Sequence, residues 1–142
     1  FPYTTLFRSQ EHSFDLANQS ILENKLDNQV GMLHDNLKGI ADKIGHNDCD
    51  VVTCNPPFFK VGSHNINPKD SKAIARHEIL ATLEDIIIEA SRLLKTKGRF
   101  AMVHRPDRLI EILDLMRKYK IYPKRLRLVY PKMNSECIVQ NF

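Results

Sequence analysis

The sequence has little of what a disulfide-stabilised or membrane-embedded protein needs. Its only cysteines are Cys49, Cys54 and Cys137, an odd number without the spacing of a disulfide framework or a metal site. No apolar run approaches the roughly 20 residues of a membrane-spanning helix, because acidic residues interrupt the stretch around Ile86. The first ten residues lack the basic start and apolar block of a signal peptide. We therefore expect free thiols, a cytoplasmic location and no membrane association.

The histidines argue against a metal site, whereas the overall charge leaves the kind of partner open. The six histidines are scattered, with no pair at i, i+4 spacing, so the sequence predicts no metal site. The 21 basic and 17 acidic residues give a formal net charge of +4, which permits an anionic partner without requiring one. With 42% apolar and 27% charged residues, the composition is that of an ordinary globular domain.

The two ends of the sequence are unusual. The chain begins with Phe1 instead of Met, and residues 1–9, FPYTTLFRS, look like translated sequencing-adaptor read-through. We interpret residues 1–9 as a non-native tail and residues 10–142 as a partial domain of a longer protein. The fold is therefore predicted from residue 10 onward.

Helix and strand patterns alternate along the chain. Apolar residues at helical spacing predict helices over about 11–24, 37–44, 71–95 and from 106 onward. Thr82 and Asp85 form a capping-box pattern near Ala81, Gly98 is a candidate helix stop, and Pro106 suits a first helical position. The last helix is expected to bury Leu109, Ile110, Leu113 and Met116.

Short apolar stretches predict the strands, over 29–33, 50–54, 99–103 and 125–129. Residues 50–54 are apolar on both faces, as in a buried parallel strand. His104, at the end of the third predicted strand, is interpreted as a structural histidine. The alternation of helices and strands predicts a three-layer α/β fold with a largely parallel sheet.

The most distinctive motif follows the strand at 50–54. In open α/β sheets, ligands bind beyond the carboxyl ends of the strands, and Asn55-Pro56-Pro57-Phe58 stands at such an end. The strand with its Asn-Pro-Pro-Phe resembles motif IV of the S-adenosylmethionine-dependent amino-methyltransferases. The resemblance implies that Asn55, Pro56, Pro57 and Phe58 are catalytic, and that Asn55 also contacts the cofactor.

The chemistry of amine methylation accounts for these residue types. The lone pair of an exocyclic purine amine is delocalised into the ring, so this amine is a poor nucleophile. The Asn55 side-chain carbonyl and the Pro56 backbone carbonyl can accept its two hydrogens and localise the lone pair toward the sulfonium methyl. Proline fixes φ and so aims its carbonyl, and Phe58 can stack on an unstacked base, a contact worth roughly 1–3 kcal/mol. The alternative is a strand-terminating turn with Phe58 in the core.

The resemblance extends beyond this motif. Residues 10–136 are similar to the bacterial tRNA adenine-N6 methyltransferases that modify an anticodon-loop adenine of tRNA(Val), through the segments NPPFFKVGSHNINPKDSKAIARHE, LLKTKGRFAMVHRPDRL and LRLVYPK. This resemblance implies the class I methyltransferase (Rossmann-like) fold and S-adenosylmethionine as methyl donor. It also implies that Asp35 contacts the adenine of the cofactor, where a helix cap is the alternative.

The sequence departs from this family in two places. The family's first strand and its Gly-rich loop are absent, and the five glycines form no cluster. Arg8 stands where the family has an acidic residue for the ribose hydroxyls. The predicted sheet is therefore incomplete, and we expect this chain to bind the cofactor weakly or not at all.

Two basic segments indicate the partner. Lys60, Lys69, Lys72 and Arg76 follow the motif, and residues 117–132, which include Lys124 and Arg125, carry seven basic residues, three tyrosines and no acid. Beside an adenine-directed motif, such residues favour binding to tRNA over a solvated helix face or a lysine-protected strand edge. The sequence thus predicts a tRNA adenine-N6 methyltransferase. Protein-glutamine methylation, DNA adenine methylation and a non-catalytic RNA-binding fragment are the alternatives.

Overall fold

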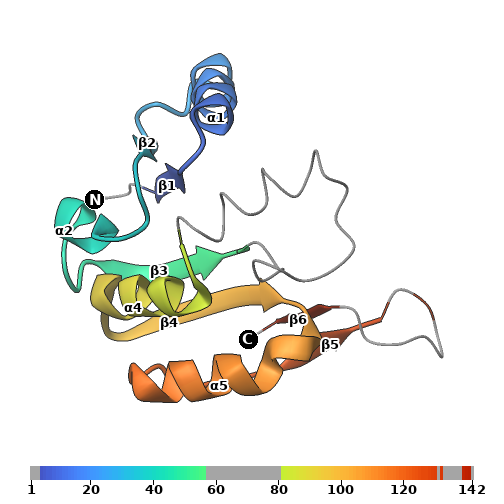
Figure 1. Cartoon of the computed structure of the whole chain (residues 1–142). Helices are drawn as coiled ribbons and strands as arrows, with labels where there is room; N and C mark the ends of the chain where they lie inside the picture. Colours follow the sequence, from blue (N-terminus) through green and yellow to red (C-terminus); the bar gives the residue numbers. More distant parts are fainter. Residues whose placement is uncertain (1–3, 57–80, 131, 133–138, 142) are drawn as a thin grey trace. The chain divides into compact units, whose positions relative to one another are not determined.

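The computed structural model describes residues 4–56, 81–130, 132 and 139–141 (Figure 1). By its internal contacts the chain divides into two compact units, Phe1–Leu37 and Lys38–Phe142, which are described separately. Several predicted site residues lie outside the described residues, namely Pro57, Phe58, Lys60, Lys69, Lys72 and Arg76.

The first unit is a strand–helix–strand motif. β1 (Thr4–Arg8) and β2 (Val30–His34) pair in parallel, and α1 (Glu11–Glu23) connects them. The ring of Phe14 on α1 stacks on His34 with 5.3 Å between centroids, which fastens the helix to β2. The predictions for α1 and β2 are confirmed almost residue for residue. β1 lies within residues 1–9, which the fold prediction does not cover. The non-native origin of these residues stays a prediction.

The second unit contains a mixed sheet of four strands. They are β3 (Cys49–Cys54), β4 (Leu94–His104), β5 (Arg127–Val129) and β6 (Val139–Asn141), in the spatial order β3-β4-β6-β5. β3 and β4 are parallel, whereas β6 runs antiparallel to both β4 and β5. β5 therefore runs in the same direction as β3 and β4. The predicted α/β class is confirmed, whereas the described sheet is mixed and not largely parallel, because both pairings of β6 are antiparallel.

Helices pack against this sheet and form the core of the second unit. They are α2 (Ile40–Ile44), α4 (Leu83–Leu93), the 3₁₀ turn η1 (Pro106–Arg108) and α5 (Leu109–Lys118). The main cluster of buried side chains joins α4, β4 and α5 through Leu83, Ile87, Met102, Ile112 and Met116. The predicted capping box begins α4, because the Thr82 Oγ1 accepts a hydrogen bond from the Asp85 N–H at 3.1 Å. Apolar contacts thus hold β4, α4 and α5 together.

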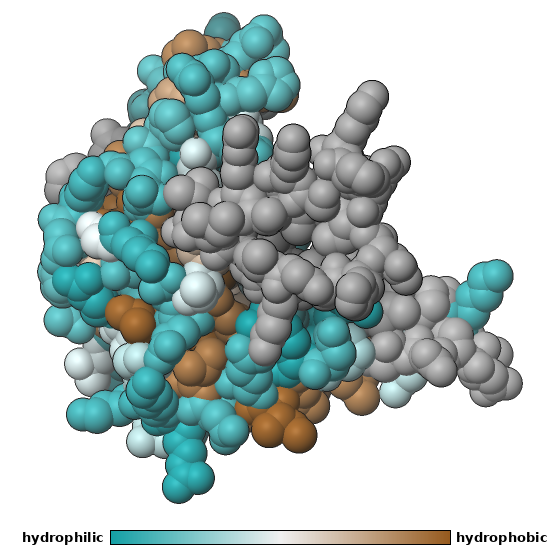
Figure 2. Space-filling model, in the orientation of Figure 1, coloured by the Kyte–Doolittle hydropathy of each residue, from teal (hydrophilic) through white to brown (hydrophobic). Residues whose placement is uncertain are grey.

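The face that helix α5 buries agrees only in part with the prediction, because Met116 is buried as expected and Ile110 is not. Ile110 is 77% exposed, whereas Ile112 is fully buried. Ile112 and Met116 are four residues apart and share one face of the helix, and Ile110 lies on another face. Figure 2 shows hydrophobic side chains at the surface over α5. The prediction for Ile110 was wrong, because the apolar residues of this helix allow more than one stripe.

Two predictions about β3 and β4 were also wrong. Gly98 does not end a helix, because α4 ends at Leu93 and the chain passes directly into β4. Gly98 instead lies where the register between β3 and β4 shifts, and a Cβ there would stand 2.9 Å from the Lys95 carbonyl oxygen. Val51 is half exposed, so β3 is not buried on both faces.

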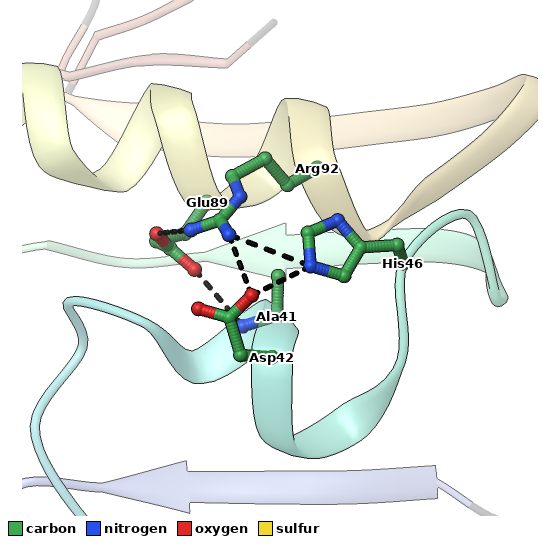
Figure 3. A network of polar contacts seen from close by, with 5 residues as sticks. All are labelled: Ala41, Asp42, His46, Glu89 and Arg92. Atoms are coloured by element: carbon green, nitrogen blue, oxygen red, sulfur yellow. Dashed lines mark hydrogen bonds and ion pairs between the residues drawn. The ribbon is translucent and has the colours of Figure 1, made fainter.

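A buried carboxylate fastens α2 to α4 (Figure 3). The N-cap of α2 is Gly39, at φ +82°, which has no side chain to cap the helix. Glu89 on α4 supplies the cap instead, since its Oε2 accepts the Ala41 N–H at 2.9 Å. Its Oε1 accepts from Arg92 Nη1 at 2.8 Å, and Arg92 Nη2 donates to Asp42 Oδ1 at 2.6 Å. The two helices thus share one polar network.

Candidate functional site

Asn55 and Pro56 extend from the carboxyl end of β3. The last residue of β3, Cys54, is paired in register with Met102 of β4 and packs against the core cluster. Burial raises the pKa of the Cys54 thiol to about 11, so Cys54 stays protonated and is an unreactive packing residue. Asn55 is exposed and Pro56 is buried. The motif therefore begins on a strand end held by the core, with the Asn55 amide accessible to a ligand.

The parallel direction of three strands brings further residues to this edge. Because β3, β4 and β5 run the same way, their carboxyl ends meet along one edge of the sheet. His104 and Leu128 both pair with Gln140, so the ends of β4 and β5 lie at the same level. The residues that follow these strands are Arg105 and Tyr130. The edge thus carries an amide, a guanidinium and a phenol ring.

His104 forms the buried support of this edge. It is fully buried at the end of β4, and its Nδ1 lies 3.3 Å from the Arg105 carbonyl oxygen. Burial lowers the pKa of the imidazole, which therefore stays neutral near pH 7. This environment agrees with the structural role expected from the sequence.

The structure places Lys124 and Arg125 elsewhere on the sheet. Both are exposed and both precede β5, so they lie toward the amino end of that strand. Asn55, by contrast, follows the carboxyl end of a strand with the same direction. The two basic residues are therefore not part of the edge that carries Asn55, and their role in RNA binding stays a prediction.

In the first unit, Asp35 directly follows β2. Its N–H donates to the Arg8 carbonyl at 3.3 Å, and its Oδ1 accepts the Asn36 N–H at 2.6 Å. Asp35 is not the cap of α2, because the N-cap of that helix is Gly39. Its partly buried carboxylate at a strand end suits a contact with an adenine amine. Arg8 ends β1 beside it, and a guanidinium has no acceptor for ribose hydroxyls.

Within the ranges 4–56, 81–130, 132 and 139–141, no three His, Cys, Asp or Glu residues are grouped as metal ligands. None of the helices in those ranges has the length and hydropathy needed to cross a membrane.

Comparison with known sequences identifies similar proteins over part of the chain. No protein-family model matches. The chain is 37% identical over 83 residues to a tRNA1(Val) (adenine(37)-N6)-methyltransferase of Porphyromonas gingivalis, which covers 58% of this chain and 32% of that protein. It is 26% identical over 95 residues to the protein of the same name from Dyadobacter fermentans, which covers 67% of this chain and 38% of that protein. The chain thus spans well under half the length of the curated relatives it matches.

Comparison with solved structures identifies the fold. A predicted O-methyltransferase from Agrobacterium tumefaciens matches 96% of this chain and 59% of its own, with a TM-score of 0.67 and 15% identity. At that identity the likeness shows the fold alone, and it confirms the class I methyltransferase (Rossmann-like) architecture predicted from the sequence. The chain therefore has the fold of class I methyltransferases and resembles in sequence the tRNA1(Val) (adenine(37)-N6)-methyltransferases.

Proposed function

We propose that this chain is part of an S-adenosylmethionine-dependent enzyme that methylates the N6 amine of an adenine in tRNA. The observation that carries the proposal is the start of the Asn-Pro-Pro-Phe motif, where exposed Asn55 follows the carboxyl end of a core-anchored parallel strand. The fold and the names of the similar proteins support the same activity. A cytoplasmic location belongs to this proposal, because tRNA is the substrate.

In this mechanism the chain holds and activates the amine. The Asn55 side-chain carbonyl and the Pro56 backbone carbonyl accept the two amine hydrogens, which makes the nitrogen more pyramidal and its lone pair more nucleophilic. S-adenosylmethionine, when bound, supplies the electrophilic methyl group, and Asp35 would contact its adenine. Positioning of the acceptor nitrogen then supplies much of the rate acceleration.

The proposal is tested with Asn55→Ala in the longest natural form of the protein that contains this sequence. We expect turnover with tRNA to fall about 100-fold or more, as when one preorganised polar contact to a transition state is removed. The affinity for S-adenosylmethionine, measured by calorimetry, should change much less than turnover, because Asn55 is only one of the expected cofactor contacts and Asp35 is unchanged. Near-wild-type turnover would remove Asn55 from the mechanism.

The same assay separates the alternatives by substrate. Equal amounts of tRNA, duplex DNA and a glutamine-bearing release factor are offered with radiolabelled S-adenosylmethionine. Label in tRNA alone supports the proposal, and label in the DNA or in the protein replaces it with that activity. Binding of tRNA without cofactor binding or methyl transfer would indicate a non-catalytic RNA-binding fragment.

A further inference from the structure

We propose that His104 is a positioning residue for methyl transfer, which holds Pro56 so that its backbone carbonyl is aimed at the amine of the target adenine. This inference rests on the proposed function and deepens it, because it assigns a role to a residue that acts through Pro56 and not on the substrate itself. His104 ends β4, the strand that pairs with β3, and β3 leads directly into the motif at Asn55.

The register of the two strands sets His104 level with Pro56. β3 and β4 are parallel, and Cys54 is the partner of Met102. Two residues further along the two strand directions stand Pro56 and His104. Within the described sheet of the second unit, β4 is the neighbour of β3. The end of β4 therefore supports the start of the motif from within the sheet.

The pattern of exposure assigns both residues to the same face of the sheet. Successive side chains of a strand point to opposite faces. Along 51–56 the odd-numbered residues are exposed, whereas the even-numbered residues are partly or fully buried, and along 99–104 the even-numbered residues are likewise the more buried ones. The even-numbered face of β4 carries Met102, which belongs to the main core cluster. Pro56 and His104 therefore both lie on the core-facing side.

The imidazole of His104 is held in one orientation. It is fully buried, and its Nδ1 lies 3.3 Å from the Arg105 carbonyl oxygen. Because a carbonyl oxygen only accepts hydrogen bonds, the proton of the neutral imidazole is on Nδ1. Arg105 is also the N-cap of η1. The contact thus ties the ring to the point where β4 passes into η1, and the ring cannot turn without breaking it.

A fixed neighbour matters at this position because the acceptors for the amine stand at the end of β3. The proposed mechanism uses the Asn55 side-chain carbonyl and the Pro56 backbone carbonyl. Proline fixes φ, but the direction of its carbonyl also depends on ψ, which is left to packing. A displacement of about 1 Å at a reacting group can cost about 100-fold in rate. Loss of the His104 contact should therefore lower turnover without weakening the binding of either substrate.

The experiment measures methyl transfer to tRNA and binding of S-adenosylmethionine in the longest natural form of the protein that contains this sequence. His104→Leu removes the Nδ1 donor and keeps an apolar side chain of similar size. We expect its kcat to fall between about 10- and 100-fold, with an unchanged KM for tRNA and an unchanged calorimetric affinity for S-adenosylmethionine. His104→Asn keeps an N–H donor at the position of Nδ1, so it should retain most of the wild-type kcat.

Ile112→Val is the control for a general loss of stability. Ile112 is fully buried in the same core cluster but belongs to α5, so this variant should melt at a lower temperature with an unchanged kcat. Circular dichroism establishes that each variant is folded at the assay temperature. Should His104→Leu not fold, His104→Gln replaces it. Its amide donor stands one bond further from the backbone and cannot keep the same contact, so the same fall in kcat is expected.

A kcat of the donor-less variant that falls by less than about 10-fold would overturn the positioning role. An equal fall in His104→Asn, or a change confined to KM, would overturn it as well. Methyl transfer to tRNA by the wild type together with any of these results retains the proposed function and rejects only the role of His104. Absence of transfer by the wild type rejects both.

Discussion

Removal of the Glu89 carboxylate should destabilise the second unit measurably. Its side chain is 6% exposed and accepts two hydrogen bonds, from the Ala41 N–H and from Arg92. Glu89→Ala leaves the Ala41 N–H without its acceptor, and an unsatisfied buried donor costs about 1–3 kcal/mol. Breaking a fully buried ion pair costs about 3–5 kcal/mol, but Arg92 is about one-third exposed and keeps Asp42 as a partner. We therefore expect a loss of about 2–3 kcal/mol.

For a chain of this length, such a loss corresponds to a fall in melting temperature of roughly 4–12 °C. The assay is thermal unfolding followed by circular dichroism at neutral pH. Asp42→Asn is the control, because Asp42 belongs to the same network but is more than half exposed, and its effect should be less than half that of Glu89→Ala. Glu89→Gln keeps one acceptor oxygen and should fall between the two. Equal melting temperatures for Glu89→Ala and wild type would refute the capping role.

Three further predictions concern charge and protonation. Reversing the charges of Lys124 and Arg125 should weaken tRNA binding and flatten its salt dependence, and an unchanged salt slope in a filter-binding assay would show that RNA does not reach this part of the sheet. Arg8→Glu places an acceptor at the end of β1 and should strengthen S-adenosylmethionine binding in calorimetry; equal or weaker binding would exclude a ribose contact there. Burial lowers the pKa of His104 below its ordinary 6.5. The contribution of neutral His104 to the free energy of unfolding is therefore complete above pH 6.5, and it declines as the pH falls from 6.5 toward the folded-state pKa. His104→Gln should therefore flatten the acid-side fall in the urea midpoint, and superimposable pH profiles would contradict this.

The parts of the site that lie next to one another in the chain were predictable from the sequence. A strand followed by Asn-Pro-Pro is a local pattern, and the structure places Asn55 and Pro56 directly after β3 as predicted. The capping box at Thr82 is equally local, because both partners belong to one helical turn. The sequence also indicated Asp35 at a strand end, but only the observed start of α2 excluded the helix-cap alternative.

Residues brought together by strand pairing were not predictable in the same way. Arg105 and Tyr130 share an edge only because antiparallel β6 lies between β4 and β5 and sets the direction of β5. The same pairing separates Lys124 and Arg125 from that edge, although both are close to Tyr130 in the chain. The local charge pattern contains no information on strand direction.

The sequence by itself determined the α/β class, most of the succession of helices and strands from residue 10 onward, and the strand that leads to Asn55 and Pro56, because periodicity, capping and proline chemistry act over a few residues. The tertiary structure decided which face of α5 is buried, that Glu89 caps a helix 48 positions away in the chain, and which polar residues join Asn55 at the sheet edge. These features depend on which elements pack together, and that choice is made by burial and pairing over the whole chain.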